Sequence, residues 1–335
     1  MDALFRQLVD WIEIPSVTGD EADYADSLAR ALTAKGFDVE LQQVAPGRSN
    51  VLARAGRPEV VFCTHLDTVP PYFGSRVDSD FVYGRGSCDA KGQAAAMLAA
   101  GERLLEAGED RIGFLFTVGE EIDSIGASHA DANLAEPWAP RWVIVGEPTG
   151  NQFVAGHKGI YKAKLVGKGV AGHSSQDVGP SAVHELVGCC ARMVMDGWGE
   201  HPMLGPGTLN VGQISGGVAP NVVADRAEAE ILVRTVESPE VVEGRVQGHL
   251  GEHVRVERTA KAYSPVEFHV PEGEEGIVVA FGTDAPHMRS WGTPLLYGAG
   301  SILDAHTDNE KVGKAELVDC VLRHERTVRG LLAGS

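Results

Sequence analysis

Apolar positions recur at helical spacing in two stretches near the N-terminus, residues 2–14 and 21–35, and Gly36 closes the second stretch. Short apolar runs then alternate with an alanine-rich helical stretch at 90–107. The predicted strands of this part are residues 37–44, 50–54, 59–64, 112–118 and 142–145. Strands that alternate with helices predict an α/β domain with a mixed, largely parallel sheet covered by helices.

The pattern changes after Gly159. From there the chain is predicted to form strands at 161–169, 208–214, 227–234 and 254–262, with helices at 181–195 and 239–250. This βαββαβ order is typical of a small α+β domain. The α/β pattern returns near Glu267 and ends in a helix at 314–332. We therefore predict a first domain of residues 1–158 and 264–335, with a second domain of residues 159–263 inserted into it.

Composition narrows the classes of function. The chain has 335 residues, 43% of them apolar, and 29 basic against 47 acidic residues give a net charge of −18. Such a charge repels phosphate backbones, so nucleic acid is not expected as a partner. No apolar run is long enough for a membrane span, and acidic residues interrupt the N-terminal apolar stretch, so we expect a cytoplasmic protein without membrane contact. The five cysteines lack metal-type spacing and are expected to be reduced thiols.

Candidate chemistry begins in the stretch VVFCTHLDTVPP, where His65 and Asp67 follow a predicted buried strand. An isolated His-x-Asp pair at a strand end is more often a surface pair than a metal site. Four further stretches change this interpretation, because each carries an acid or a histidine just after a strand or in a glycine-rich turn. They are GRGSCDAKG with Asp89, FTVGEEIDS with Glu120 and Glu121, VGEPTG with Glu147, and GAGSILDAHTDNE with His306.

The carboxyl ends of strands are where ligands bind in α/β sheets, so these side chains are expected to converge. Histidine and carboxylate ligands without thiolates suit zinc, or cobalt and manganese as substitutes. Asp89, expected at the start of a helix, is the natural candidate to bridge two metal ions. Asp67 is expected to orient the imidazole of His65 and to raise its basicity.

Together these motifs resemble the dinuclear zinc peptidases and deacylases, a family that includes acetylornithine deacetylase, succinyl-diaminopimelate desuccinylase, carboxypeptidase G and the aminoacylases. The resemblance runs from IPSVTG near the N-terminus to AHTDNE near the C-terminus. It implies two zinc ions per subunit. One would be bound by His65, Asp89 and Glu147, and the other by Asp89, Glu121 and His306. Glu120 matches the general base of the family.

The same resemblance assigns roles in the inserted domain, which it makes a dimerisation and lid domain. His173 in KGVAGHSSQ matches an oxyanion donor that reaches the active site of the partner subunit in a homodimer. Asn221 and Arg234 match substrate-binding residues, with Arg234 binding a carboxylate in a bidentate manner. Gly300 and Ser301 resemble a turn that helps to hold that carboxylate. Without the resemblance, His173 could simply be an exposed loop residue and Arg234 a structural ion-pair partner.

The function predicted from the sequence is that of a metal-dependent amidohydrolase acting on an N-acyl amino acid, similar to acetylornithine deacetylase and to enzymes of amino-acid biosynthesis. A water shared by the two metal ions would attack the amide, with Glu120 as general base. Two alternatives use the same metal site: a hydrolase that releases lysine or ornithine from an amino-group carrier protein, and a dipeptidase or carboxypeptidase. A relative that only binds its ligand would not need the intact set of ligands and base present here.

Overall fold

The computed structural model describes residues 2–334, which form two compact units. Unit 1 comprises Met1–Ala155, Glu267–Ile277 and Thr283–Ser335, and unit 2 comprises Gly156–Val266 and Val278–Gly282. The two main transitions lie three residues from the boundaries expected from the sequence. The return of residues 278–282 to unit 2 was not expected.

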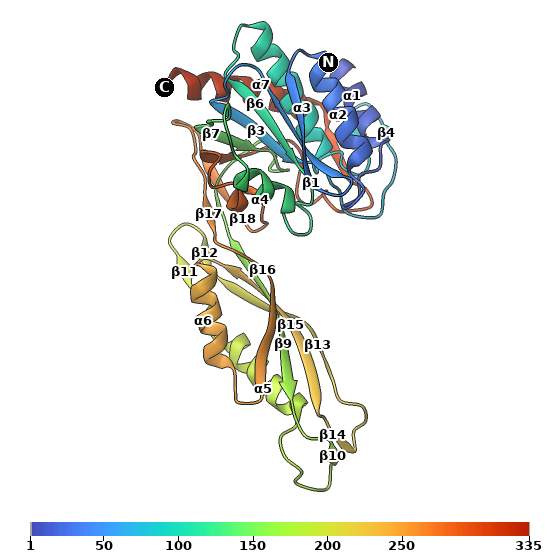
Figure 1. Cartoon of the computed structure of the whole chain (residues 1–335), viewed down its shortest axis with the longest axis vertical. Helices are drawn as coiled ribbons and strands as arrows, with labels where there is room; N and C mark the ends of the chain where they lie inside the picture. Colours follow the sequence, from blue (N-terminus) through green and yellow to red (C-terminus); the bar gives the residue numbers. More distant parts are fainter. Residues whose placement is uncertain (1, 335) are drawn as a thin grey trace. The chain divides into compact units, whose positions relative to one another are not determined.

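Unit 1 is built on a six-stranded sheet with the order β1-β2-β6-β3-β7-β19. Figure 1 labels β1, β6, β3 and β7 of this sheet. The strands are β1 (Asp38–Ala45), β2 (Arg48–Arg54), β3 (Val60–His65), β6 (Ile112–Thr117), β7 (Trp142–Val145) and β19 (Thr293–Leu296). β1, β2 and β6 pair antiparallel, whereas β6, β3, β7 and β19 pair parallel. The predicted mixed, largely parallel sheet of an α/β fold is confirmed.

The centre of this sheet is fully buried, which explains why its strands are nearly continuous apolar runs. β3 lies between β6 and β7, with His65 opposite Thr117 and Cys63 opposite Val145. Because the three strands are parallel, their carboxyl ends meet at one edge of the sheet. The segments that follow them are therefore brought together there.

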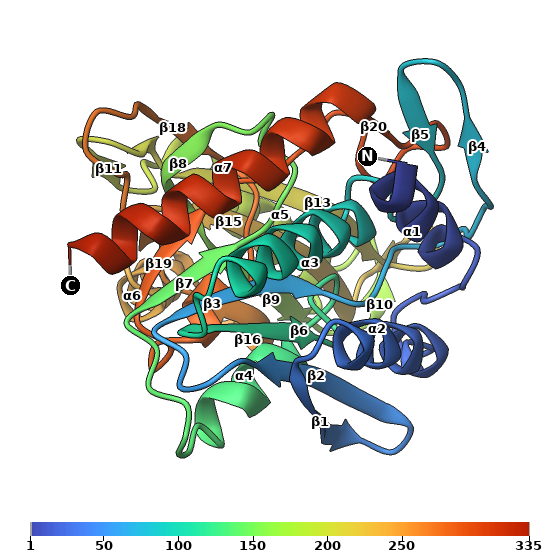
Figure 2. The same cartoon turned by 90° about the horizontal axis from the view of Figure 1, so that it is seen from above.

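Helices cover the sheet of unit 1, and Figure 2 shows α3 and α7 side by side. Small residues allow α3 to pack closely, since a Cβ added at Gly101 would lie 2.4 Å from the ring of Phe114. The helices are α1 (Asp2–Ile12), α2 (Ala22–Ala34), α3 (Lys91–Glu106), α4 (Ile125–Ala132), α7 (Lys314–Ala333) and the 3-10 helix η1 (Ala285–His287). Among the described residues, no helix combines the length and apolar character needed to cross a bilayer.

Three short strands form a second, antiparallel sheet of unit 1 with the order β20-β5-β4. They are β4 (Arg76–Val77), β5 (Phe81–Tyr83) and β20 (Lys311–Gly313). A further three-stranded sheet has the order β17-β8-β18 and contains β8 (Phe153–His157), β17 (Val266–Glu267) and β18 (Gly276–Val279).

Unit 2 contains a four-stranded antiparallel sheet with the order β13-β15-β9-β16 and two helices. The larger elements are β9 (Gly159–Lys168), α5 (Ala182–Met195), β13 (Thr208–Gly216), β15 (Arg226–Thr235), α6 (Pro239–His249) and β16 (Val254–Tyr263). Their order along the chain is the βαββαβ order expected from the sequence. Four two-residue strands pair as β10 (Gly172–His173) with β14 (Val222–Val223), and as β11 (Glu200–His201) with β12 (Gly205–Pro206).

Candidate metal centre

Polar side chains gather where the parallel strands of unit 1 end. His65 is the last residue of β3, Glu120 and Glu121 lie in the turn after β6, and Glu147 follows β7. Asp89 lies in the turn before α3. The sequence predicted Asp89 at the start of this helix, but α3 begins two residues later, at Lys91. The placement at strand ends is the one predicted from the sequence.

Asp89 lies between two histidines, and each oxygen of its carboxylate faces one of them. Oδ1 is 2.9 Å from His65 Nε2, and Oδ2 is 3.2 Å from His306 Nε2. Glu121 Oε1 is 3.0 Å from the same nitrogen of His306. Among the described residues, ligand atoms of His65, Asp89 and Glu121 lie within 4.8 Å of one another. This geometry suits a carboxylate that bridges two metal ions.

The chemistry of these side chains also fits a cation. His65 Nδ1 is 2.8 Å from the carbonyl oxygen of Asp67, which can only accept, so Nδ1–H donates and Nε2 faces Asp89. Burial acts to lower the pKa of His65, but Asp67 and Asp89 raise it well above its ordinary value. Hydrogen bonds to Asp89 and Glu121 raise the pKa of His306 to about 10. The carboxylates therefore favour positive charge at both histidine nitrogens, which a bound metal ion would supply in place of a proton.

The carboxylates respond to the same surroundings in different ways. Burial acts to raise the pKa of Asp89, but hydrogen bonds to His306 and His65 outweigh it and lower that pKa. Burial raises the pKa of Glu147 well above its ordinary value, and burial with the nearby charge of Asp89 raises the pKa of Glu121. These are acids crowded together in a buried place, an arrangement that a divalent cation stabilises.

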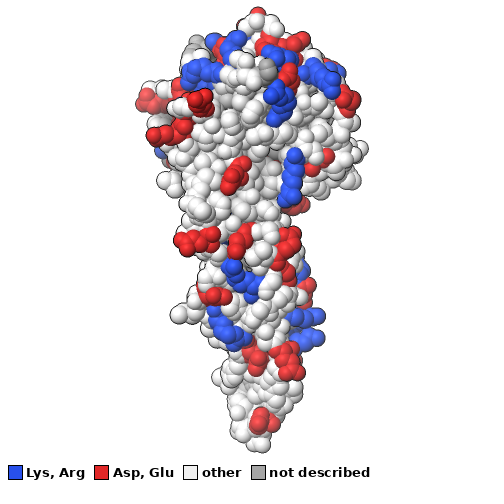
Figure 3. Space-filling view, turned by 90° about the vertical axis from the view of Figure 1, so that its left-hand side faces the viewer, with Lys and Arg blue, Asp and Glu red and all other residues white. Residues whose placement is uncertain are grey.

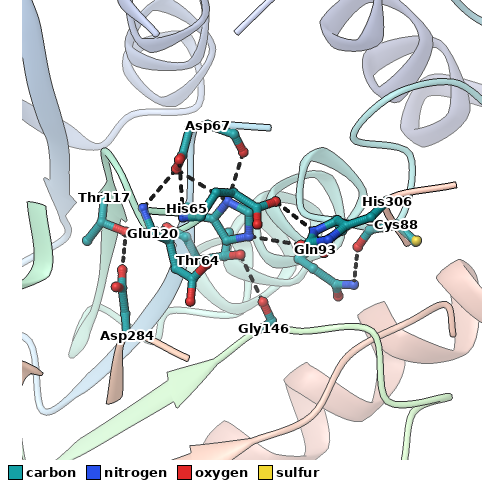
Figure 4. A network of polar contacts seen from close by, with 12 residues as sticks. Thr64, His65, Asp67, Cys88, Gln93, Thr117, Glu120, Gly146, Asp284 and His306 are labelled. Carbon is teal, nitrogen blue, oxygen red and sulfur yellow. Dashed lines mark hydrogen bonds and ion pairs between the residues drawn. The ribbon is translucent and has the colours of Figure 1, made fainter. Parts of the chain in front are cut away.

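Asp67 acts mainly on the backbone of the Glu120 turn. Figure 4 shows Asp67 beside Glu120, and the Oδ1 atom of Asp67 accepts the N–H of Glu120. Oδ1 also accepts the N–H of Gly119, and Oδ2 accepts the N–H of Glu121 and the hydroxyl of Thr18. The short contact to His65 comes from the Asp67 carbonyl, while the carboxylate oxygen lies 3.5 Å from His65 Nδ1. The sequence analysis expected the Asp67 side chain to orient His65. In the structure the carbonyl oxygen of Asp67 makes the closer contact with His65.

Glu120 and Glu147 lie in the same cluster, since the charge of Glu120 contributes to the raised pKa of Glu147. Glu147 is 5% exposed, while Glu120 is partly exposed. Glu120 is not among the three residues with closely spaced ligand atoms. Glu147 and His306 are not among those three either, so the roles of Glu120 as base and of Glu147 and His306 as ligands stay predictions.

Several residues that support the site were not singled out from the sequence. Gln93 donates to the carbonyl oxygens of Cys88 and Ala299 at 2.8 and 2.6 Å, and accepts the N–H of Ala299 at 3.1 Å. Thr18 holds Asp67, and a buried pair of Arg85 and Glu310 lies next to the Asp89 turn. Arg85 and Glu310 stand inside the motifs GRGSCDAKG and AHTDNE, so their places in the sequence were the available indication.

Gly300 and Ser301 lie beside the Asp89 turn of unit 1. A Cβ added at Gly300 would lie 2.5 Å from the Cβ of Cys88, and Ser301 forms an isolated antiparallel bridge with Thr149. The N–H of Gly300 donates to Glu316 Oε1 at 2.8 Å. The structure thus places this turn next to the proposed ligand Asp89, while its contact with a substrate stays a prediction.

The remaining candidates lie in unit 2. His173 pairs with Val222 between β10 and β14, and Asn221 accepts the N–H of Ser174 at 3.0 Å, so His173 and Asn221 are neighbours. Arg234 lies at the other end of β15 from β14, opposite Ile160. Within unit 2, the structure therefore brings His173 and Asn221 together and separates both from Arg234.

Comparison with known proteins identifies relatives over nearly the whole chain. The model of a family described as "Peptidase family M20/M25/M40" matches residues 61–330. A peptidase M20 domain-containing protein of Schizosaccharomyces pombe is 35% identical over 331 residues, which cover 95% of this chain and 82% of the relative. A probable carboxypeptidase of Aspergillus flavus is 34% identical, with 96% of this chain and 88% of the relative covered.

A solved structure shows the same fold. An M20 family metallo-carboxypeptidase from Sulfolobus solfataricus superimposes with a TM-score of 0.78 at 18% identity, covering 97% of this chain and 98% of the other. The two chains therefore share a fold although few of their aligned residues are identical.

Proposed function

The chain belongs to the peptidase family M20/M25/M40 and is a metal-dependent hydrolase, and from this membership we propose that it cleaves an amide bond next to a free carboxylate of its substrate. The observation that carries the proposal is the position of Asp89, whose two carboxylate oxygens face His65 and His306 at 2.9 and 3.2 Å. A carboxylate placed between two nitrogen ligands could bridge two metal ions, as a two-metal mechanism of hydrolysis needs.

We propose two zinc ions per subunit, with cobalt or manganese as substitutes. His65, Asp89 and Glu147 would hold one ion, and Asp89, Glu121 and His306 the other. When bound, the ions would polarise the amide carbonyl and lower the pKa of a water molecule from 15.7 to about 7. Glu120 would take the proton of that water and return it to the leaving amine.

Unit 2 would complete the site in a homodimer. The N–H of Ser175 lies 3.2 Å from His173 Nδ1 and donates to it, so the neutral ring carries its proton on Nε2. The Nε2–H group of His173 can donate to the oxyanion of the tetrahedral intermediate. His173 would act in the active site of the partner subunit. Asn221 and Arg234 would bind substrate, with Arg234 binding its carboxylate.

The resemblance to probable carboxypeptidases favours a short peptide as substrate. The second candidate is an N-acyl amino acid, as in acetylornithine deacetylase, and the GEPT form of the Glu147 stretch favours it. Release of an amino acid from an acidic carrier protein receives less support. On the face drawn in Figure 3, basic side chains lie among acidic ones, and in unit 2 Lys164 pairs with Glu228 and Glu257.

A substrate panel tests the proposal. Dipeptides, N-acetyl amino acids and N-succinyl amino acids should be compared with zinc or cobalt added, and each with its carboxylate converted to an amide. We expect hydrolysis of at least one class and a strong loss when the carboxylate is blocked. Equal hydrolysis of free and blocked substrates would contradict the proposed carboxylate recognition.

A further inference from the structure

A buried ion pair connects the ligand segments of unit 1 without supplying a proposed ligand itself. Glu310 is fully buried and Arg85 is 1% exposed, and Arg85 Nη1 donates to Glu310 Oε2 at 2.6 Å. Two charges taken out of water cost several kcal/mol each unless they are paired and well hydrogen-bonded. The other contacts of this pair therefore indicate what it stabilises.

The second oxygen of Glu310 faces the turn that carries Asp89. Oε1 accepts the backbone N–H of Cys88 at 3.2 Å and that of Asp89 at 3.1 Å. The carbonyl oxygen of Glu310 accepts the N–H of Gly84 at 3.1 Å, which fixes Glu310 to the start of the same turn. Glu310 also follows His306 by only four residues. One side chain thus links the segments of two proposed ligands.

Arg85 extends this link to the segment after His65. Its Nε atom donates to the carbonyl oxygen of Pro71 at 3.2 Å. Its backbone N–H donates to the carbonyl oxygen of Phe73 at 3.2 Å. The guanidinium also lies over the ring of Phe73, 5.0 Å from its centre. Segments near His65, Asp89 and His306 therefore meet at this ion pair.

We propose that Glu310 is a positioning residue for metal binding, which holds the backbone of Asp89 so that both carboxylate oxygens face their histidines. Arg85 acts through Glu310 by fixing the orientation of its carboxylate. This inference rests on the proposed function, because it takes the Asp89 cluster as the metal site. Groups that orient metal ligands in this way typically contribute about 10–100-fold to metal affinity.

Glu310→Gln is the direct test, with metal affinity of the metal-free protein measured by competition with a chelating dye. The amide keeps the size of the side chain, but its nitrogen cannot accept a hydrogen bond, so either Arg85 or the Asp89 turn loses its acceptor. We expect affinity for zinc and cobalt to fall about 10–100-fold and the absorption spectrum of bound cobalt to change. Arg85→Gln should lower affinity less, and should add no further loss to Glu310→Gln, since both act through one carboxylate.

Tyr297→Phe is the matched control. It removes a buried hydrogen bond of 2.7 Å to His324 in the same unit, but that bond touches no proposed ligand. It should lower the melting temperature and leave metal affinity unchanged. Unchanged metal affinity in Glu310→Gln, with only the melting temperature lowered, would show a merely structural role and overturn the inference.

If Glu310→Gln does not fold, Arg85→Lys takes its place, because lysine keeps the charge but cannot serve both Glu310 and Pro71. Native metal affinity in Arg85→Lys would overturn the inference, and a reduced affinity would support it. A native protein that binds no metal would contradict the proposed function, whereas equal binding by native protein and variants would contradict this inference alone.

Discussion

The carboxylate of Asp67 holds the backbone of Glu120, whose N–H group donates to Asp67 Oδ1 at 3.0 Å. The other carboxylate oxygen accepts the N–H of Glu121 at 3.2 Å. One buried side chain thus sets the position of the proposed base and of a proposed ligand. Burial acts to raise the pKa of Asp67, but the nearby His65 and hydrogen bonds from Thr18 and the Glu121 backbone lower it, which keeps the acceptor ionised.

Asp67→Asn should therefore impair metal binding and turnover together. The amide nitrogen cannot accept, so at least one buried donor of the turn loses its partner, at a cost of about 1–3 kcal/mol. We expect metal affinity and kcat each to fall about 10–100-fold. Thr18→Val, which removes only the hydroxyl donor, should have the smaller effect. Native metal affinity and kcat in Asp67→Asn would argue against this positioning role.

Removal of metal should abolish hydrolysis. Prolonged chelation should leave a folded, inactive protein, and zinc, cobalt or manganese should restore activity, because nitrogen and oxygen donors suit these ions. Calcium is the control, since it prefers sites made only of oxygen. Full activity after complete chelation, verified by elemental analysis, would refute a metal-dependent mechanism.

Stability should depend on the protonation of His324. Burial lowers the pKa of this side chain to about 3, whereas in the unfolded chain it is about 6.5. Below pH 6.5 the unfolded chain therefore binds a proton that the folded protein rejects, so stability falls as the pH is lowered toward 3. The contribution is about 1.4 kcal/mol per pH unit.

Urea unfolding of the metal-free protein between pH 7 and 5 measures this effect. His324→Gln should have a flatter pH profile than the native protein, so that the difference in stability between them narrows as the pH falls. Parallel profiles would contradict the assignment.

The action of His173 in the partner subunit is tested by complementation. A mixed dimer of one Glu120→Ala chain and one His173→Ala chain would have one site with both defects and one with neither. Random exchange of the two inactive homodimers should recover roughly a quarter of the native activity, because about half of the dimers are mixed. No recovery, despite demonstrated subunit exchange, would place His173 in the site of its own chain.

Long elements with clear periodicity could be predicted from the sequence. β7 has the predicted bounds, and the predicted helix at 90–107 differs from α3 by one residue at each end. Two-residue strands such as β10 and β14 have no periodicity to detect, and α4 is short and buries Gly126 and Ala127 at its start. These elements depend on contacts with distant segments.

The site, like the fold, could be predicted from the sequence only in part. His65, Asp89 and Glu121 follow apolar strands or occupy glycine-rich turns, so their residue types and places predicted a cluster, and the structure brings them together. The tasks of Asp67 and Glu310 depend on hydrogen bonds to backbone N–H groups. Almost every residue type carries a backbone N–H group, so the residue types could not predict these contacts.

Of the two neighbouring acids, we propose that Glu121 binds metal and that Glu120 transfers the proton. Metal content and kcat, measured together for Glu120→Gln and Glu121→Gln, distinguish these two roles. We predict that Glu120→Gln keeps two metal ions per chain and loses kcat by about 10²–10⁴-fold, whereas Glu121→Gln binds less metal. Glu120→Gln that loses metal, beside Glu121→Gln that keeps both ions, would reverse the two roles and contradict the account.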